Sequence, residues 1–402
     1  MKIMIAADTY APDVNGASYF AQRLAAGLAT EHEVHVLAPS RSRHTTSAAA
    51  AGGITEHRVR SLPVVVRRGF RICPPAGLQR RVRTLLQTVR PDVVHVQSHF
   101  LVGRAVVRAA HALGIPVVAT NHFMPENLLH YVPGGAAVHR RVHAWAWRDA
   151  AGVLGLADVV TSPTPFAAAL AESAGVPGPV LPISCGLDLD RFTPERDGAR
   201  FRRAHGLPPG PVLAYVGRLD PEKNVHELIE ALALVRSRWD VHLLVVGDGQ
   251  ERSALEVLAA ARGVADSVTF TGLLDDAELP EAYAAADLFG IAGTAELQSL
   301  VTLEAMATGL PVLGVDAGAL PHLVRHGETG WLYRHGDVRA LAGRLTALLD
   351  DPTTARQMGR RARAVAAGHD LGATLSAFVG LYDACLRTRA ADRPRQVQPV
   401  MA

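Results

Sequence analysis

Short apolar runs alternate along the chain with longer stretches whose apolar residues recur at helical spacing. The runs predict buried strands, at 2–7, 34–38, 92–96, 116–120, 158–162, 211–216, 241–247, 268–274, 286–291 and 312–315. The longer stretches predict helices, at 19–28, 78–90, 299–309, 337–350, 352–367 and 371–387. Strands that alternate with helices favour parallel sheets, so the pattern predicts an α/β protein.

The length of the chain indicates two domains, because 402 residues exceed what one hydrophobic core usually holds. A connection at 181–194, rich in Pro, Gly and Asp, separates two halves that each open with a strand, a glycine-containing loop and a helix. We expect an N-terminal domain at 1–185, a second domain at 186–370, a last helix at 371–388 and a disordered tail at 389–402.

Composition and charge bear on the cellular location and the binding partners of the protein. The net charge is +3, yet residues 1–185 carry 18 Lys and Arg against 10 Asp and Glu, so the first half is basic. Cys73, Cys185 and Cys385 are far apart, without metal-ligand spacing, which favours a reducing, cytoplasmic location. The first apolar run is too short for a signal peptide, and no run is long enough to span a membrane.

Two loops that follow predicted strands contain residues suited to phosphate binding. The first holds Asn15 and Gly16, where close approach of the backbone favours a phosphate and a simple turn is the alternative. The second holds Arg218 and Lys223, whose cations can both neutralise a diphosphate. Surface pairing of Lys223 with Glu222 or Glu227 is the alternative there.

The stretch from Glu296 to Glu304 lies between two predicted strands and places one carboxylate in a loop and one in a helix. Ser299 is the expected N-cap of that helix, so the amides of Leu300 and Val301 would face an anionic ligand. The alternative is that both carboxylates are ordinary solvated residues.

Two further features of the first half allow both a functional and a structural interpretation. His122 follows a predicted strand, where a lone histidine is more often structural than catalytic. The basic helix at Leu78–Arg90 has the pattern of a helix that lies on an anionic membrane, or of an ordinary amphipathic helix packed on a core. Nucleic-acid binding is disfavoured, because no aromatic platform or recognition motif accompanies the charge.

Taken together, these motifs resemble the family 4 retaining glycosyltransferases, in particular bacterial glycolipid, phosphatidylinositol mannosyl- and diacylglycerol glucosyltransferases. The resemblance rests on Gly217-Arg218-Leu219-Asp220-Pro221-Glu222-Lys223-Asn224, on Glu296 and Glu304 with seven residues between them, and on Gly309-Leu310-Pro311-Val312. It implies the GT-B fold, in which two Rossmann-like domains with parallel sheets face each other across a cleft. It also implies that the last helix crosses back to the first domain.

The resemblance assigns roles to individual residues. Arg218 and Lys223 resemble the clamp on the pyrophosphate, Glu304 the residue that binds the ribose, and Glu296 the carboxylate near the donor sugar. Gln298, Ser299 and Leu300 match the loop whose amides meet the donor sugar. Gly16 matches the glycine that approaches the diphosphate, and His122 matches the acceptor-side histidine. The chain departs from the family pattern at Asn15, where a second glycine is frequent, and at Ser299, which replaces a frequent glycine.

The implied activity is transfer of a hexose from a UDP- or GDP-sugar to an acceptor hydroxyl, with retention of configuration and without a metal ion or other cofactor. The acceptor is expected on a membrane lipid, with the enzyme in the cytoplasm or at the inner face of the plasma membrane through Leu78–Arg90. Alternatives are a soluble secondary metabolite or sugar alcohol as acceptor, a GT-B sugar-nucleotide epimerase, and a non-catalytic nucleotide-sugar-binding protein.

Overall fold

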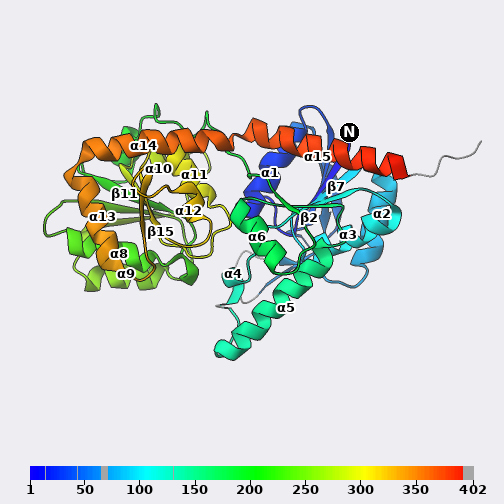
Figure 1. The fold of residues 1–402 in the computed structure, drawn as a ribbon, viewed down its shortest axis with the longest axis horizontal. Helices are drawn as coiled ribbons and strands as arrows, with labels where there is room; N and C mark the ends of the chain where they lie inside the picture. Colours follow the sequence, from blue (N-terminus) through cyan, green and yellow to red (C-terminus); the bar gives the residue numbers. More distant parts are fainter. Residues whose placement is uncertain (14, 43, 65–70, 130, 393–402) are drawn as a thin grey trace, which may run out of the picture. The chain divides into compact units, whose positions relative to one another are not determined.

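The computed structural model describes residues 1–13, 15–42, 44–64, 71–129 and 131–392, which form two compact units. Unit 1 contains Met1–Pro125, Gly134–Ser184 and the chain from Gly372 onward, and unit 2 contains Glu126–Pro133 and Cys185–Leu371. Each unit is built on a sheet that helices cover (Figure 1). None of the helices in these ranges is both long and apolar enough to cross a bilayer.

The described part of unit 1 has an eight-stranded sheet in the order β10-β9-β8-β7-β1-β2-β4-β3. Its neighbouring strands pair in parallel, except that β3 is antiparallel to β4. The strands are β1 (Lys2–Ala6), β2 (Glu33–Pro39), β3 (Thr46–Ala49), β4 (Thr55–Val59), β7 (Val93–Val96), β8 (Val117–Thr120), β9 (Val159–Ser162) and β10 (Val180–Pro182). The central strands read as nearly continuous apolar runs because helices bury both of their faces.

Helices and short elements complete unit 1. Helix α3 packs against strands β1, β2, β7 and β8, so it covers the middle of the sheet. The helices are α1 (Gly16–Leu28), α2 (Leu78–Val89), α3 (Leu101–Leu113), α5 (Ala136–Leu154), α6 (Pro165–Ser173) and α15 (Leu371–Asp392), with the short strands β5 (Leu62–Pro63) and β6 (Arg71–Ile72) and the turn η1 (Ala51–Gly53).

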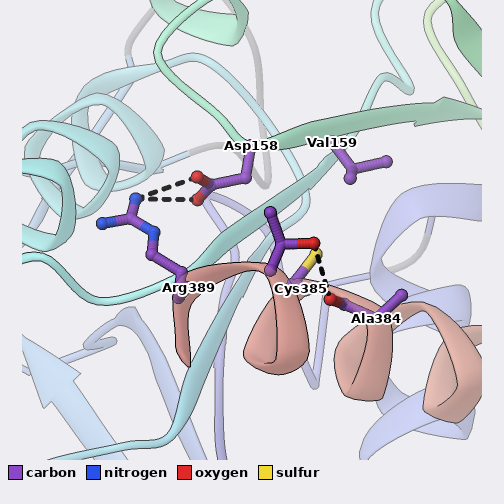
Figure 2. A pocket seen from close by; sticks show the side chains of 6 residues that line it. Asp158, Val159, Ala384, Cys385 and Arg389 are labelled. Atoms are coloured by element: carbon purple, nitrogen blue, oxygen red, sulfur yellow. Dashed lines mark hydrogen bonds and ion pairs between the residues drawn. The ribbon is translucent and has the colours of Figure 1, made fainter. Parts of the chain in front are cut away.

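Helix α15 is held on the sheet of unit 1 by a buried chain of hydrogen bonds. The hydroxyl of Tyr382 lies 2.6 Å from Nδ1 of His95, whose Nε2 lies 2.7 Å from Oγ1 of Thr120. Near the end of the helix, Arg389 Nη2 is 2.9 Å from a carboxylate oxygen of Asp158 (Figure 2). His95 is therefore structural, in a site where burial lowers its pKa to about 3.

The described part of unit 2 has a six-stranded parallel sheet in the order β13-β12-β11-β14-β15-β16. The strands are β11 (Val212–Val216), β12 (His242–Val246), β13 (Val268–Gly272), β14 (Leu288–Ile291), β15 (Val312–Val315) and β16 (Gly330–Tyr333). Counted from β11, this is the order 3-2-1-4-5-6 of a dinucleotide-binding fold, so the strand order reverses between β11 and β14.

The helices of unit 2 pack around this sheet and around one another. Helix α14 contacts α11, and α13 contacts α8. They are α4 (Glu126–Leu129), α7 (Ala199–Ala204), α8 (Val225–Val235), α9 (Arg252–Ala261), α10 (Leu279–Ala284), α11 (Leu300–Ala307), α12 (Leu320–Leu323), α13 (Val338–Asp350) and α14 (Pro352–Ala366), with short 3-10 turns at Pro221–Lys223, Ala265–Ser267 and Ala367–His369.

Two expected boundaries differ from the structure. The connection expected at 181–194 begins with a strand, because Val180–Pro182 pairs in parallel with β9. Helix α15 continues to Asp392, four residues beyond the expected end at 388, and the ion pair between Arg389 and Asp158 stabilises this extension. The remainder of the expected tail, 393–402, lies outside the described residues.

Candidate active site

Two loops of unit 2 meet where the strand order of the sheet reverses. The first, residues 217–224, follows β11, and the second, residues 292–299, follows β14. Because β11 and β14 are parallel neighbours, both loops leave the same edge of the sheet. Ligands of open α/β sheets bind at this edge, beside the point where the order reverses.

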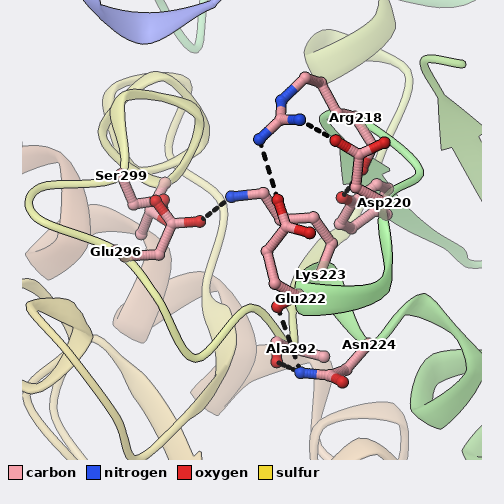
Figure 3. Close-up of polar contacts among 10 residues, drawn as sticks. Arg218, Asp220, Glu222, Lys223, Asn224, Ala292, Glu296 and Ser299 are labelled. Carbon is pink, nitrogen blue, oxygen red and sulfur yellow. Dashed lines mark hydrogen bonds and ion pairs between the residues drawn. The ribbon is translucent and has the colours of Figure 1, made fainter. Parts of the chain in front are cut away.

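An ion pair joins the two loops (Figure 3). The ammonium group of Lys223 lies 2.6 Å from Oε1 of Glu296, and only 14% and 12% of their side chains are exposed. The side-chain amide of Asn224 adds a second link, since it donates to the carbonyl oxygen of Ala292 at 3.1 Å. The structure thus brings together two residues that the sequence separates by 73 positions.

The alternative of a local surface pair for Lys223 is wrong. Glu222 instead pairs with Arg218, whose Nη2 lies 2.9 Å from its Oε1. Glu227 is buried beside the ring of His335, at 2.8 Å. Both carboxylates have other partners, and the ammonium group of Lys223 contacts Glu296 in the loop after β14.

Arg218 is the second cation of the cluster and is held from several sides. Its guanidinium pairs with Asp220 as well as with Glu222 (Figure 3). The hydroxyl of buried Tyr215 donates to its carbonyl oxygen at 2.7 Å, which fixes the backbone of the loop. Acidic side chains therefore neutralise both cations, and an anionic ligand would have to displace these carboxylates.

Two glycines let the backbone approach Glu296 closely. Gly318 has a φ of +58°, and a Cβ atom there would lie 2.8 Å from the carbonyl oxygen of Glu296. That oxygen accepts a hydrogen bond from the amide of Ala319 at 2.9 Å. A Cβ atom at Gly293 would lie 3.1 Å from Oε1 of Glu296. A side chain at Gly293 would therefore crowd the carboxylate, and one at Gly318 would crowd the backbone of Glu296.

The start of α11 differs in one respect from expectation. Ser299 occupies the N-cap position, but its φ is +66° and its hydroxyl contacts Oγ1 of Thr302 at 2.8 Å instead of a backbone amide. An N-cap serine needs an extended backbone to reach the amides, so the predicted side-chain cap is wrong. The amides of Leu300 and Val301 still belong to the first helical turn, which has no intrahelical acceptor for them.

The side chain of Gln298 is used within unit 2. Its Oε1 accepts a hydrogen bond from the amide of Cys185 at 3.0 Å, and only 4% of the residue is exposed. Gln298 therefore anchors the first residues of unit 2 beside the loop after β14. This anchoring leaves the backbone of 298–300 as the part of the loop that can meet a ligand.

Glu304 is buried in α11 and has a partner that the sequence did not indicate. The hydroxyl of Tyr283 donates to its Oε2 at 2.9 Å, from helix α10. Burial, followed by the negative charge of Glu304, raises the pKa of Tyr283 well above its ordinary value. Tyr283 is thus a permanent donor that orients the carboxylate.

In unit 1, His122 follows β8 and contacts Gln97, which follows the neighbouring strand β7. Nε2 of His122 lies 3.0 Å from Oε1 of Gln97, an atom that only accepts. Burial lowers the pKa of His122 to about 4, so the ring is neutral. The contact therefore places the proton on Nε2 and a lone pair on Nδ1. Gln97 was missed from the sequence, although its position directly after a strand is a signal.

Gly16 opens helix α1 at the edge of the unit 1 sheet. The side chain of Asn15 accepts a hydrogen bond from the amide of Ser18 at 2.9 Å, so Asn15 is an N-cap and the alternative of a simple turn is wrong. The amide of Gly16 lies in the first turn of the helix, where amides have no intrahelical acceptor. In the described ranges, no three His, Cys, Asp or Glu side chains form a group that could hold a metal ion.

The two units, each built on a sheet of mainly parallel strands, define the fold class, an α/β fold of the GT-B type. The solved sucrose-phosphate synthase of Thermosynechococcus elongatus superimposes with a TM-score of 0.79 at 22% sequence identity, over 96% of this chain and 100% of that one. This similarity confirms the predicted fold.

Sequence comparison supplies the family. The model of Glycosyltransferase Family 4 matches residues 14–191, and that of Glycosyl transferases group 1 matches residues 198–365. A GDP-mannose-dependent alpha-mannosyltransferase of Mycolicibacterium smegmatis is 32% identical over 396 residues, which are 97% of this chain and 99% of the relative. A GDP-mannose-dependent alpha-(1-6)-phosphatidylinositol monomannoside mannosyltransferase of the same species is 37% identical over 213 residues, 50% of this chain and 56% of the relative.

The chain belongs to the family 4 glycosyltransferases. It is an enzyme that transfers a sugar from a nucleotide-sugar donor to an acceptor, as the resemblance predicts.

Proposed function

We propose that the enzyme transfers mannose from GDP-mannose to a hydroxyl group of a membrane lipid, with retention of the anomeric configuration. The donor is supported by the mannosyltransferase that matches 97% of the chain, and the lipid acceptor by the phosphatidylinositol monomannoside mannosyltransferase. The observation that carries the proposal is the contact of Lys223 with Glu296 at the edge of the unit 2 sheet.

Lys223 and Arg218 are proposed to bind the diphosphate. Departure of the diphosphate leaves negative charge on its oxygens, and preorganised cations stabilise such charge strongly. The ligand would replace Glu296 on Lys223, and Asp220 and Glu222 on Arg218. The amides at 299–301 would add the partial positive charge of a helix start. The proposal therefore assigns charge stabilisation to the protein, without a metal ion or cofactor.

The two glutamates are proposed to bind opposite ends of the donor. Glu304, oriented by Tyr283, would accept hydrogen bonds from the ribose hydroxyls. Glu296, once the diphosphate has replaced it beside Lys223, would accept hydrogen bonds from the hydroxyls of the hexose. Because Glu296 lies beside the cation that the diphosphate needs, donor binding and release of Glu296 are one event in this scheme.

Retention is proposed to follow from attack on the face that the diphosphate leaves. The bond from the anomeric carbon to the diphosphate oxygen breaks, and a bond to the acceptor oxygen forms on the same face. The acceptor proton passes to the leaving phosphate oxygen. His122 of unit 1, with its lone pair on Nδ1, is proposed to accept a hydrogen bond from the acceptor, and Gly16 to offer its amide to the diphosphate.

Helix α2 is proposed to attract the enzyme to the inner face of the plasma membrane. Leu78, Val82 and Leu86 are buried in the core of unit 1, which supports the interpretation of α2 as an ordinary amphipathic helix on its inner side. Its outer side exposes the arginines Arg80, Arg81 and Arg83. This side offers charge alone, so the attraction would be sensitive to salt.

One experiment tests donor, acceptor and stereochemistry together. The enzyme is incubated with GDP-mannose or UDP-glucose, with and without membrane lipids, and the product is analysed by mass spectrometry and by the anomeric coupling in its NMR spectrum. An α-mannosyl lipid formed only with GDP-mannose and lipid supports the proposal. A rearranged sugar nucleotide formed without acceptor would favour the epimerase, and transfer only to soluble sugar alcohols or metabolites would overturn the lipid acceptor.

A further inference from the structure

Helix α5 of unit 1 carries two tryptophans that have opposite surroundings. Trp147 is 4% exposed and its ring lies 5.7 Å from that of Phe123, centroid to centroid. Trp145, two residues earlier, is 61% exposed. The helix projects beyond the body of its unit (Figure 1). Trp145 is thus a large apolar side chain on a projecting element.

The exposed face of α5 combines apolar and cationic side chains. Val138, Arg141, Trp145 and Arg148 follow one another at spacings of three, four and three residues, so they lie on one side of the helix. All four are exposed, and neither arginine has an ion pair within the described ranges. Asp149, the acidic residue of the helix, pairs with Arg104 of α3 and does not neutralise this face.

This combination fits an anionic lipid surface. Tryptophan is enriched at the boundary between headgroups and acyl chains, where its ring is apolar and its N–H still meets polar groups. Arginine stems extend over apolar surroundings while the guanidinium reaches the headgroups. Helix α2 does not offer this combination, because its apolar residues Leu78, Val82 and Leu86 are buried in the core of unit 1.

We infer that the α5 face, defined by Val138, Arg141, Trp145 and Arg148, docks on the surface of an anionic bilayer with Trp145 inserted at the headgroup level. The inference rests on the proposed function, in which the acceptor is a membrane lipid, and deepens it by naming the docking surface. Helix α2 contributes long-range attraction, and α5 contributes the insertion that remains when salt screens the charges.

Co-sedimentation of the full-length enzyme with vesicles tests the charges of the face. Vesicles of phosphatidylcholine alone are compared with vesicles that also contain phosphatidylglycerol. Each arginine near an anionic surface contributes about 1 kcal/mol, so R141A/R148A should weaken binding roughly 30-fold. The control R360A/R361A removes the same charge from exposed positions on α14 and should change binding much less. Equal binding by the two double variants would overturn the inference.

Tryptophan quenching tests the insertion. Vesicles with brominated acyl chains should quench part of the fluorescence of the wild-type enzyme, at low and at high salt, and W145F should abolish that part. Quenching that persists in W145F, or no vesicle binding by the wild-type enzyme, would overturn the docking surface. Release of GDP from GDP-mannose is measured in parallel on detergent-dispersed lipid, where the α5 variants should remain active. If the wild-type enzyme releases no GDP on detergent-dispersed lipid, the proposed function is refuted and not the docking surface.

Discussion

The ammonium group of Lys223 contacts the carboxylate of Glu296 at 2.6 Å, although 73 positions separate the two residues. The contact arises because β11 and β14 are parallel neighbours, so that the loops after them share one edge of the sheet. A lysine at this position is unusual for this chain. The chain contains only two lysines, Lys2 and Lys223, and uses arginine for every other fixed positive side chain.

Replacement of Lys223 by Ala should lower kcat/KM for sugar transfer by roughly 100- to 1,000-fold, because one preorganised group that stabilises leaving-group charge is lost. K223R should also be impaired, since the planar guanidinium cannot take the place of a compact ammonium beside Glu296. The control is K2A, which removes the other lysine and its surface pair with Glu33. Steady-state kinetics on all three variants decide the matter, and near-normal turnover of K223A would remove Lys223 from the diphosphate site.

Glu296→Gln should separate nucleotide binding from transfer. In the structure the carboxylate of Glu296 forms an ion pair with Lys223. A neutral amide in its place should leave the ammonium group more available to a diphosphate. Calorimetric titration should give an unchanged or lower Kd for GDP, while kcat falls because the hexose loses its acceptor carboxylate. A variant that binds GDP much more weakly, with transfer reduced only in proportion, would contradict this division of roles.

The α/β architecture was predictable because the strands are continuous apolar runs between helical stretches. Strands β11 and β14 both show this, with every residue buried. Their neighbourhood in the sheet was not predictable, since strand order depends on how helices pack and not on local spacing. The contact between Lys223 and Glu296 therefore emerged only from the fold, although the family resemblance had placed both residues at one ligand.

Contacts between side chains of different elements were the least accessible part of the site. Tyr283 reaches Glu304 from α10, and nothing in the spacing of either helix indicates this approach. The misassigned cap at Ser299 has a related cause, because a serine before a helix predicts an extended backbone and the loop imposes a φ of +66°. Tertiary packing decides both features.

Tyr283→Phe should weaken binding of nucleotides through their ribose. Loss of the hydroxyl removes the hydrogen bond that orients Glu304, which should cost roughly tenfold in the Kd of GDP. The matched ligand is 2′,3′-dideoxy-GDP, which lacks the hydroxyls assigned to Glu304 and should bind wild type and variant alike. Equal losses for both ligands would mean that Tyr283 supports the fold of the site and does not act through the ribose.

Acid should destabilise unit 1 through its buried histidines. The pKa of His95 is lowered to about 3 and that of His122 to about 4, from an ordinary value of 6.5, in each case mainly by burial. Below pH 6.5 the unfolded chain binds protons that the folded chain does not, so stability is lost as the pH falls, down to about pH 4 for His122. Well below pH 6.5, and above the pKa of the folded state, the slope should approach about 1.4 kcal/mol per pH unit for each histidine.

Urea unfolding between pH 7 and pH 5 measures this slope. H122N should reduce it by the share of one histidine, whereas H44N, at an exposed position, should leave it unchanged. A slope that is the same in H122N and in wild type would show that His122 gains its proton at the same pH in the folded and the unfolded enzyme, so that burial does not lower its pKa.

Gly359 and Gly343 should respond oppositely to substitution by Ala. A Cβ atom at Gly359, in α14, would lie 1.9 Å from the carbonyl oxygen of Gly309 at the end of α11, whereas one at Gly343, in α13, would meet no atom within 4 Å. G359A should therefore destabilise unit 2 by about 1–3 kcal/mol through overpacking. G343A should stabilise it by about 0.5–1 kcal/mol, because alanine is the better helix former. Denaturant midpoints measure both, and since α11 carries Glu304, G359A should also weaken GDP binding. Equal midpoints for the two variants would mean that α11 and α14 separate at little cost.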